Sequence, residues 1–250
     1  MKARGCEPNV ITYNILINGY IKTKRIDEAL GLFKDMSRRG LIPDTITYTT
    51  IIGGLCDASR PLDACVLLNE METHGQQPDL FTYGTLLKCL CKEKRLDEAL
   101  LLLKVIEDNG LVPDIVLYNI LIDGMCKAGK LDAAKEFFLR VPTKGLRPDS
   151  YTYNAMLNGL CKKGKLNEVN ELLREMKEHS CSPSGCTYNI IVRGFLQNNE
   201  TSEAIQHLQT MRDSGFSADA STLDLVFNLL SNDQLDPLCK EGLQRFLGIT

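Results

Sequence analysis

The 250-residue sequence has no tryptophan, only three histidines and an aromatic content of 6%. It contains no run of 18 apolar residues, so a membrane span is not expected, and its N-terminus has the layout of neither a secretory signal nor a transit peptide. It also lacks paired C-x-x-C clusters and the H-x-E…P-C-x-x-C signature of zinc deaminases. We therefore expect no catalytic activity, metal, cofactor or small-molecule substrate.

The sequence also lacks an excess of basic residues, because it has 29 Lys and Arg but 32 Asp and Glu, and the net charge is −3. Nucleic-acid-binding domains are usually basic, so RNA or DNA binding would require a locally concentrated basic stripe. Cysteine is abundant, and Cys56, Cys91, Cys126 and Cys161 recur at one interval. Equivalent positions of stacked helices lie about 8–10 Å apart, too far for disulfides. These residues are expected to be buried thiols of a reducing compartment.

The dominant feature is a repeat with a 35-residue period. A tyrosine recurs at Tyr13, Tyr48, Tyr83, Tyr118, Tyr153 and Tyr188, and a proline at Pro43, Pro78, Pro113, Pro148 and Pro183. Such a period is typical of stacked repeat arrays. We predict the end of a truncated preceding repeat at 1–9 and six units at 10–44, 45–79, 80–114, 115–149, 150–184 and 185–219. A degenerate capping repeat is predicted at 220–250, and the chain is expected to be a fragment or to have an unusual start.

Each unit carries two helical patterns. Tyr13, Leu16 and Ile17 recur at helical spacing in the first, and Ala29 and Phe33 do so in the second. The second helix is predicted to begin at an N-cap of the series Asp27, Asp97, Asp132, Asn167 and Ser202, and to end at a left-handed glycine of the series Gly40, Gly75, Gly110, Gly145 and Gly215. Pro142 is expected to end its helix early, and Pro237 falls inside the second pattern of the last unit. Glycines inside the first helix, such as Gly19, indicate close approach of helices. Stacked hairpins predict an all-α, right-handed α-solenoid superhelix.

Two polar positions remain after packing is assigned. The fifth residues of the units are Asn14, Thr49, Gly84, Asn119, Asn154 and Asn189, and the last residues are Asp44, Asp79, Asp114, Asp149, Ser184 and Asp219. Either series can be read as capping or turn residues. The fifth position changes identity while its neighbours do not, which is typical of a position that reads a ligand.

An apolar and a basic series accompany them. The second residues of the units, Ile11, Ile46, Phe81, Val116, Tyr151 and Cys186, either pack between helices or stack against bases. Lysines late in the first helix, Lys22, Lys92, Lys127 and Lys162, either contact phosphates or complement the helix dipole.

The copies V-I-T-Y-N-I-L-I-N-G-Y at Val10, I-V-L-Y-N-I-L-I-D-G-M-C-K-A-G-K-L-D-A-A at 115–134 and S-Y-T-Y-N-A-M-L-N-G-L-C-K-K-G-K-L-N-E at 150–168 closely resemble the pentatricopeptide repeat in its plain 35-residue form, the P class. The resemblance is strong over about 1–219 and weak over 220–250. More loosely, the chain resembles the plant restorer-of-fertility-like subgroup. The family implies binding of single-stranded RNA at one base per repeat, with the fifth and last residues reading the base and the second residue sandwiching it.

Carried over unit by unit, the resemblance implies the core U-G-(purine)-U-C-U, with the RNA 5′ end at the protein N-terminus. Gly84 with Asp114 departs from the common pairs and is expected to select weakly, and Cys186 is a weak sandwich residue. The resemblance further implies a role in organellar RNA processing, stability, editing or translation, in a mitochondrion or alternatively a chloroplast, with other RNA-processing proteins as partners. A protein-binding scaffold like the tetratricopeptide arrays is the alternative. The 35-residue period and the variable fifth position favour RNA.

Overall fold

The computed structural model describes residues 7–231 and 236–248, and within these ranges it contains helices and no strand. The helices are α1 (Val10–Lys22), α2 (Ile26–Arg38), α3 (Thr45–Asp57), α4 (Pro61–Thr73), α5 (Leu80–Lys92), α6 (Leu96–Asp108), α7 (Ile115–Lys127), α8 (Leu131–Thr143), α9 (Ser150–Lys162), α10 (Leu166–Glu178), α11 (Gly185–Gln197), α12 (Thr201–Asp213), α13 (Ala220–Leu230) and α14 (Pro237–Leu247). Each odd-numbered helix begins at the first residue of a sequence unit. The predicted all-α fold built of helix pairs is confirmed. Most of the predicted end of a preceding repeat, residues 1–6, lies outside the described ranges.

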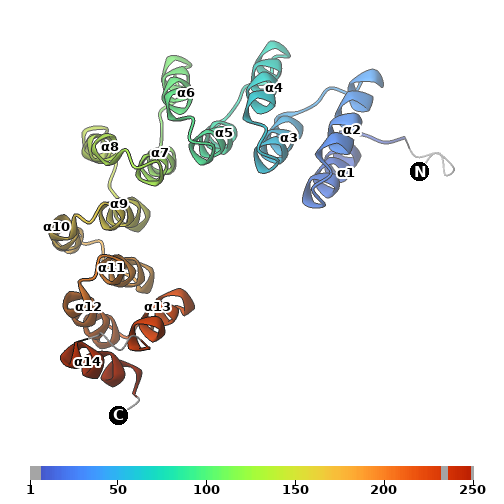
Figure 1. Cartoon of the computed structure of the whole chain (residues 1–250). Coiled ribbons are helices and arrows are strands. Elements are labelled where there is room, and N and C mark those ends of the chain that lie inside the picture. Colours follow the sequence, from blue (N-terminus) through green and yellow to red (C-terminus); the bar gives the residue numbers. More distant parts are fainter. Residues whose placement is uncertain (1–6, 232–235, 249–250) are drawn as a thin grey trace. The chain divides into compact units, whose positions relative to one another are not determined.

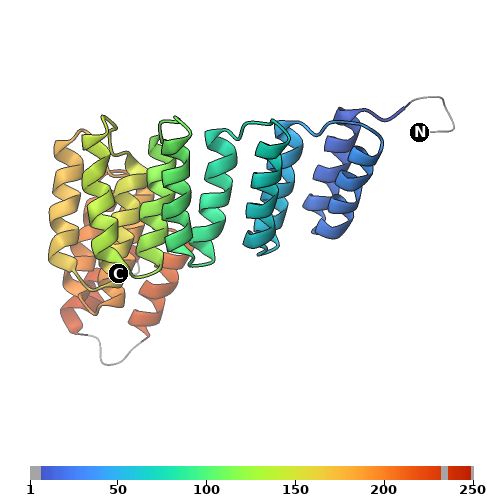
Figure 2. The ribbon, with the colours of Figure 1, turned by 90° about the horizontal axis from the view of Figure 1, so that it is seen from above.

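The chain divides into two compact units, residues 1–124 and 125–250. In the first, α3 packs between α1 and α5, and α2 and α4 each pack against the odd-numbered helices before and after them. Figure 1 shows α3 and α5 in one row and α4 and α6 in the other. In the second, α11 packs against α9 and α13, and α14 packs against α12 and α13. Figure 2 shows the helices of each pair running alongside one another. The odd-numbered helices of each compact unit therefore form one layer.

The core of each repeat is built from the residues that recur at helical spacing. Tyr48 and Tyr83 on the odd-numbered helices are at most 1% exposed, and Ala29 and Met36 on α2 are fully buried. The hydroxyl of Tyr83 reaches the end of its hairpin, where it donates to Glu72 Oε1 (3.0 Å) and accepts from Asn109 Nδ2 (2.9 Å). A buried tyrosine needs such a partner for its polar tip, so this residue type serves both core packing and loop attachment.

Glycines inside the odd-numbered helices mark close helix contacts, as predicted. A Cβ on Gly194 would lie 2.2 Å from Cys161 Sγ, and one on Gly159 would lie 2.5 Å from Cys126 Sγ. Among the described residues, no atom outside the helix backbone around Gly19 lies within 4 Å of a Cβ placed on this glycine, so the prediction is wrong at this position. Cys161 is 4% exposed, and burial raises the pKa of its thiol to about 12. This cysteine is therefore a buried, neutral packing group.

The predicted N-caps of the even-numbered helices are wrong. The N-cap of α2 is Arg25 and that of α6 is Arg95, neither of which makes a side-chain capping bond, and Asp27 lies inside the first turn. An acidic residue there is stabilised by the positive end of the helix dipole. The predicted left-handed glycines are correct, because Gly40, Gly75, Gly110, Gly145 and Gly215 have φ between +72° and +79°.

The structure also differs from the sequence-based expectations for two prolines. α8 extends to Thr143 despite Pro142, so Pro142 does not shorten it. Only one intrahelical bond is lost in this last turn, and the chain leaves the helix at Gly145 in any case. Pro237 is not inside a helix but starts α14, where the N-cap Asp236 accepts from Cys239 N at 3.1 Å. A proline is well tolerated at this first position.

Candidate nucleic-acid interface

The last residue of each sequence unit caps the first helix of the next. Asp44 precedes α3 in an extended conformation and accepts from Thr47 N at 2.8 Å. The same bond from the third helical residue is made to Asp79, Asp114, Asp149, Ser184 and Asp219. The capping interpretation is therefore correct for this series. In the aspartates, this backbone bond goes to Oδ1, which leaves Oδ2 for other partners.

The fifth residue of a unit contacts the cap that begins the next unit. Asn14 Nδ2 on α1 donates to Asp44 Oδ1 (3.2 Å), and Asn14 Oδ1 accepts from Thr47 Oγ1 (2.6 Å). Thr49 on α3 is linked to Asp79 through a hydroxyl, since Thr49 Oγ1 lies 2.7 Å from Thr82 Oγ1 and Thr82 Oγ1 lies 2.8 Å from Asp79 Oδ1. The structure thus brings together two residues that are 30 positions apart in the sequence.

Threonine at the third position of the next unit completes this arrangement and was missed by the sequence interpretation. Thr47 and Thr82 are fully buried and hydrogen-bond to the cap and to the fifth residue of the preceding unit. The same buried threonine recurs as Thr152, Thr187 and Thr222. The signal was available, because Asp or Ser followed three residues later by Thr is a capping-box spacing.

Electrostatics at the first site favour an ionised carboxylate. Partial burial acts to raise the pKa of Asp44, but hydrogen bonds from Thr47 and Asn14 outweigh it, and the pKa lies below its usual value. Ionised Asp44 accepts hydrogen bonds only, whereas the Asn14 amide both donates and accepts. The site therefore offers both polarities to the edge of a planar ligand.

The third site lacks these polar groups. Gly84 has no side chain, and the residue at the threonine position is Leu117, whose backbone N–H still donates to Asp114 Oδ1 (3.1 Å). Leu117 is 1% exposed, and its Cδ2 would lie 3.2 Å from a Cβ on Gly84. The leucine therefore fills the space that Asn or Thr occupies in other units.

The remaining sites differ from one another. Asn119 lies on α7 in the first compact unit, and Asp149 caps α9 in the second. Asn154 Oδ1 is buried and is without a hydrogen-bond partner among the described residues, and Ser184 Oγ lies 3.2 Å from Thr187 Oγ1. Asn189 is 4% exposed and accepts from Asp219 N at 3.0 Å.

The second residues of the units are exposed apolar side chains. Ile11, Ile46, Phe81, Val116 and Tyr151 are 56% to 78% exposed, and Cys186 is also exposed. They lie near the start of the odd-numbered helices and do not contribute to the core. The predicted lysines, Lys22, Lys92, Lys127 and Lys162, are exposed in the last turn of α1, α5, α7 and α9. In each compact unit, the layer of odd-numbered helices thus carries members of all three predicted series.

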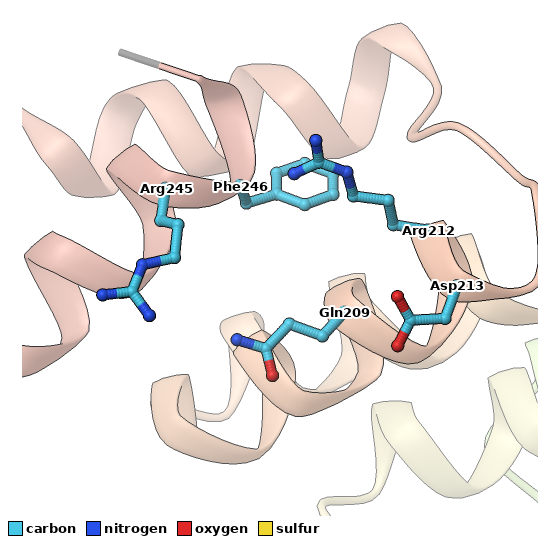
Figure 3. A pocket seen from close by; sticks show the side chains of 5 residues that line it. All are labelled: Gln209, Arg212, Asp213, Arg245 and Phe246. Carbon is cyan, nitrogen blue, oxygen red and sulfur yellow. The ribbon is translucent and has the colours of Figure 1, made fainter. Parts of the chain in front are cut away.

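Other surface features of the described residues are less suited to a functional site. A depression between α12 and α14 is lined by Gln209, Arg212, Asp213, Arg245 and Phe246, whose side chains are seen in Figure 3. It contains none of the predicted site residues. Within residues 7–231 and 236–248, no cluster of three or more His, Cys, Asp or Glu could hold a metal ion, and no helix is long and apolar enough to span a membrane.

Solved structures with the same helical architecture include the pentatricopeptide repeat protein PPR10 from maize (23% identity, TM-score 0.62, 99% of this chain and 42% of that one). PPR10 in complex with an 18-nt psaJ RNA element is equally similar. The PPR domain of Arabidopsis thaliana protein-only RNase P 1, in complex with tRNA, is 18% identical (TM-score 0.57, 71% of this chain and 94% of that one). This chain therefore spans less than half the length of PPR10. These likenesses establish the fold.

Comparison with curated proteins gives no match. Models of the repeat itself do match: the PPR repeat family over residues 8–57, 43–92, 113–162 and 148–197, and the PPR repeat over 81–111 and 186–216. Together these segments cover most of the sequence, in phase with the 35-residue units. The chain belongs to the PPR repeat family.

Proposed function

We propose that this chain binds single-stranded RNA, with one base held by each 35-residue unit. The fifth residue of a unit and the cap of the next unit read the base edge. The second residues of consecutive units hold the base between their exposed side chains. Lys22, Lys92, Lys127 and Lys162 contact the phosphates. Base stacking on such side chains contributes about 1–3 kcal/mol per base and tolerates any sequence, so selectivity has to come from the polar pairs.

One observation carries the proposal. Asn14 and Asp44 are joined by a 3.2 Å hydrogen bond, although they belong to different helices and are 30 residues apart. Ile11, which is 66% exposed, lies one helical turn before Asn14. A polar pair beside an exposed apolar side chain is suited to a nucleobase, because its edge needs hydrogen bonds and its faces need stacking partners.

The chemistry of the pairs supports the first five bases of the predicted order U-G-(purine)-U-C-U. At the first site, Asp44 Oδ2 can accept the N3–H of uracil while the Asn14 amide donates to a uracil carbonyl oxygen. At the second site, Thr49 with Asp79 offers a hydroxyl and a carboxylate to guanine. At the fifth, Ser184 replaces the carboxylate with a hydroxyl that can also donate, which suits cytosine. The pair Asn119 with Asp149 is assigned to uracil by the same logic.

Selection from a random single-stranded RNA pool tests this proposal. The intact chain is expected to enrich U-G-N-U-C at its first five sites, and equal binding of a shuffled sequence contradicts base reading. Asn154→Thr combined with Ser184→Asp copies the Thr49 and Asp79 pair into the fifth site. This variant should change the fifth base from cytosine to guanine. The second base is the internal control, because its site is unaltered and its guanine preference should persist.

We also propose the biological setting that the resemblance implies. The chain is a P-class repeat protein, of the plant restorer-of-fertility-like type, that acts in a mitochondrion, with a chloroplast as the second choice. Its bound transcript is processed, stabilised, edited or translated with the help of other RNA-processing proteins. The regular 35-residue units without insertions support the P-class assignment. Crosslinking and sequencing of RNA from fractionated plant organelles tests it, and recovery of only cytosolic transcripts contradicts it.

A further inference from the structure

The sixth site has the same two residue types as the first, but a different geometry. Asn189 Nδ2 donates to Gly185 O (2.8 Å), and Asn189 Oδ1 accepts from Asp219 N (3.0 Å). In the first site the corresponding amide Nδ2 of Asn14 instead donates to the carboxylate of Asp44. Asn189 is also nearly buried, at 4% exposure. Both polar ends of the Asn189 side chain are therefore occupied by backbone groups.

Arg193 binds the carboxylate of Asp219, to which the Asn189 side chain does not hydrogen-bond. Arg193 lies one turn after Asn189 on α11, and its Nη1 lies 2.8 Å from Asp219 Oδ1 and 2.7 Å from Oδ2. The same nitrogen lies 3.2 Å from Thr222 Oγ1. Oδ1 additionally accepts from Thr222 N at 2.9 Å, as part of the cap of α13. Both carboxylate oxygens of Asp219 are thus bound by the guanidinium, whereas Asp44 Oδ2 has only the Asn14 amide nitrogen as a partner among the described residues, at 3.5 Å.

The charge balance at this site also differs. Partial burial acts to raise the pKa of Asp219, but the hydrogen bond from Arg193 and those from Thr222 outweigh it, so the pKa is lowered and the carboxylate stays ionised. Its negative charge is compensated by a guanidinium whose side chain is 26% exposed. The equivalent position of the first unit is Asn18, which carries no charge. A base entering the sixth site therefore meets a neutralised acceptor and a cationic donor.

We infer that Arg193 is a specificity-determining residue, which withdraws Asp219 from base reading, so that the sixth unit does not select uracil as the first unit does. This inference rests on the proposed RNA-binding function. The N3–H of uracil needs a hydrogen-bond acceptor, and at the sixth site the guanidinium of Arg193 already binds the Asp219 carboxylate that would serve. The remaining N–H groups of the guanidinium only donate, and they suit acceptor-rich edges such as that of guanine. Two units with the same reading pair thus differ in base preference through a residue outside the pair.

The test is binding of the intact chain to single-stranded RNAs that vary at the first or the sixth base. In the unaltered protein, the first base should favour uracil by about fivefold or more, which is the effect of one good base contact, and the sixth should not. Arg193→Asn installs the side-chain type of Asn18 and should raise the uracil preference at the sixth base to that of the first. The reciprocal change Asn18→Arg, beside Asn14 and Asp44, should remove the uracil preference at the first base.

Three outcomes overturn the inference. One is equal uracil selection at the first and sixth bases of the unaltered protein. Another is an unchanged sixth-base profile in Arg193→Asn. A third is a uniform loss of affinity for all four bases in that variant, which would make Arg193 a phosphate contact. Absence of any preference at every position, including the first two, would overturn the proposed function itself. Circular dichroism of both variants verifies that their helix content and melting temperature match those of the unaltered chain.

Discussion

Leu117 occupies the space next to Gly84 that a side chain would need: its Cδ2 lies 3.2 Å from the position of a Cβ on the glycine. The two residues belong to consecutive repeats and depart together from the pattern, the glycine from Asn or Thr and the leucine from Thr. The apolar contact replaces the hydroxyl link present at the second site. Under the proposed base-reading function, two positions therefore remove polar selection at this site.

We predict that polar reading can be restored there only by changing both residues. Gly84→Asn alone should leave the third base unselected and destabilise the chain by about 1–3 kcal/mol, because the new side chain meets Leu117 in a packed core. Adding Leu117→Thr recreates the first-site set together with Asp114, and the third base should then favour uracil by about fivefold or more. Binding to RNAs varied at the third base measures this. Restoration by Gly84→Asn alone would show that the leucine does not block the site.

We predict that Lys92→Ala weakens binding to all RNA sequences equally. Its side chain is exposed in the last turn of α5, and loss of one phosphate contact should lower the slope of log affinity against log salt by about 0.7. Lys104→Ala is the matched control, since Lys104 is exposed on α6 in the other layer of the same repeat. A base-selective loss, or an equal effect of the control, contradicts the phosphate assignment.

Much of the fold followed from the sequence, because the 35-residue period fixes the units and the helical spacing fixes the buried faces. The N-caps of the even-numbered helices did not follow from the sequence. An acidic residue such as Asp27 is favourable both as an N-cap and in the first turn, and residue type alone does not separate positions two residues apart. The pairing of Asn14 with Asp44 came from the family resemblance. The contact between Arg193 and Asp219 depends on how two consecutive repeats are set against each other, which no local pattern encodes.

We predict opposite effects of alanine at two equivalent glycines. Gly194→Ala should destabilise the chain by about 1–3 kcal/mol, because its Cβ would lie 2.2 Å from Cys161 Sγ. Gly19→Ala should stabilise α1 by up to about 1 kcal/mol, because no neighbouring atom of the described residues lies within 4 Å of the new Cβ and alanine is the better helix former. Thermal unfolding followed by circular dichroism measures both changes. Adding Cys161→Gly removes both the Sγ and the Cβ that would lie 2.5 Å away, so it should cost less in Gly194→Ala than in the unaltered chain. Equal costs in the two backgrounds would place the strain elsewhere.

We predict that His207 makes the second compact unit less stable in acid. Burial lowers its pKa, nearby Lys177 lowers it further, and Glu203 opposes the shift. The ring packs 4.9 Å from that of Phe195. The folded state therefore favours neutral histidine, so this stability is present above about pH 6.5, the pKa in the unfolded chain, and is lost as the pH falls through the lower folded-state pKa. As the pH is lowered from 8 to 5, the melting temperature should fall more steeply for the unaltered chain than for His207→Gln. Parallel curves of melting temperature against pH would contradict this.

The caps at Asp44, Asp79, Asp114, Asp149, Ser184 and Asp219 restrict how such a protein can be retargeted. A residue that starts a helix is replaced cheaply only within a small group, mainly Asp, Asn, Ser, Thr and Gly, and other side chains cost about 0.5–2 kcal/mol of helix stability. The fifth residue of a unit does not cap a helix, and glycine is found at this position. The residue types allowed at the capping position are therefore limited by helix initiation. A library that randomises the capping position freely would lower the stability of most of its members before any ligand is tested.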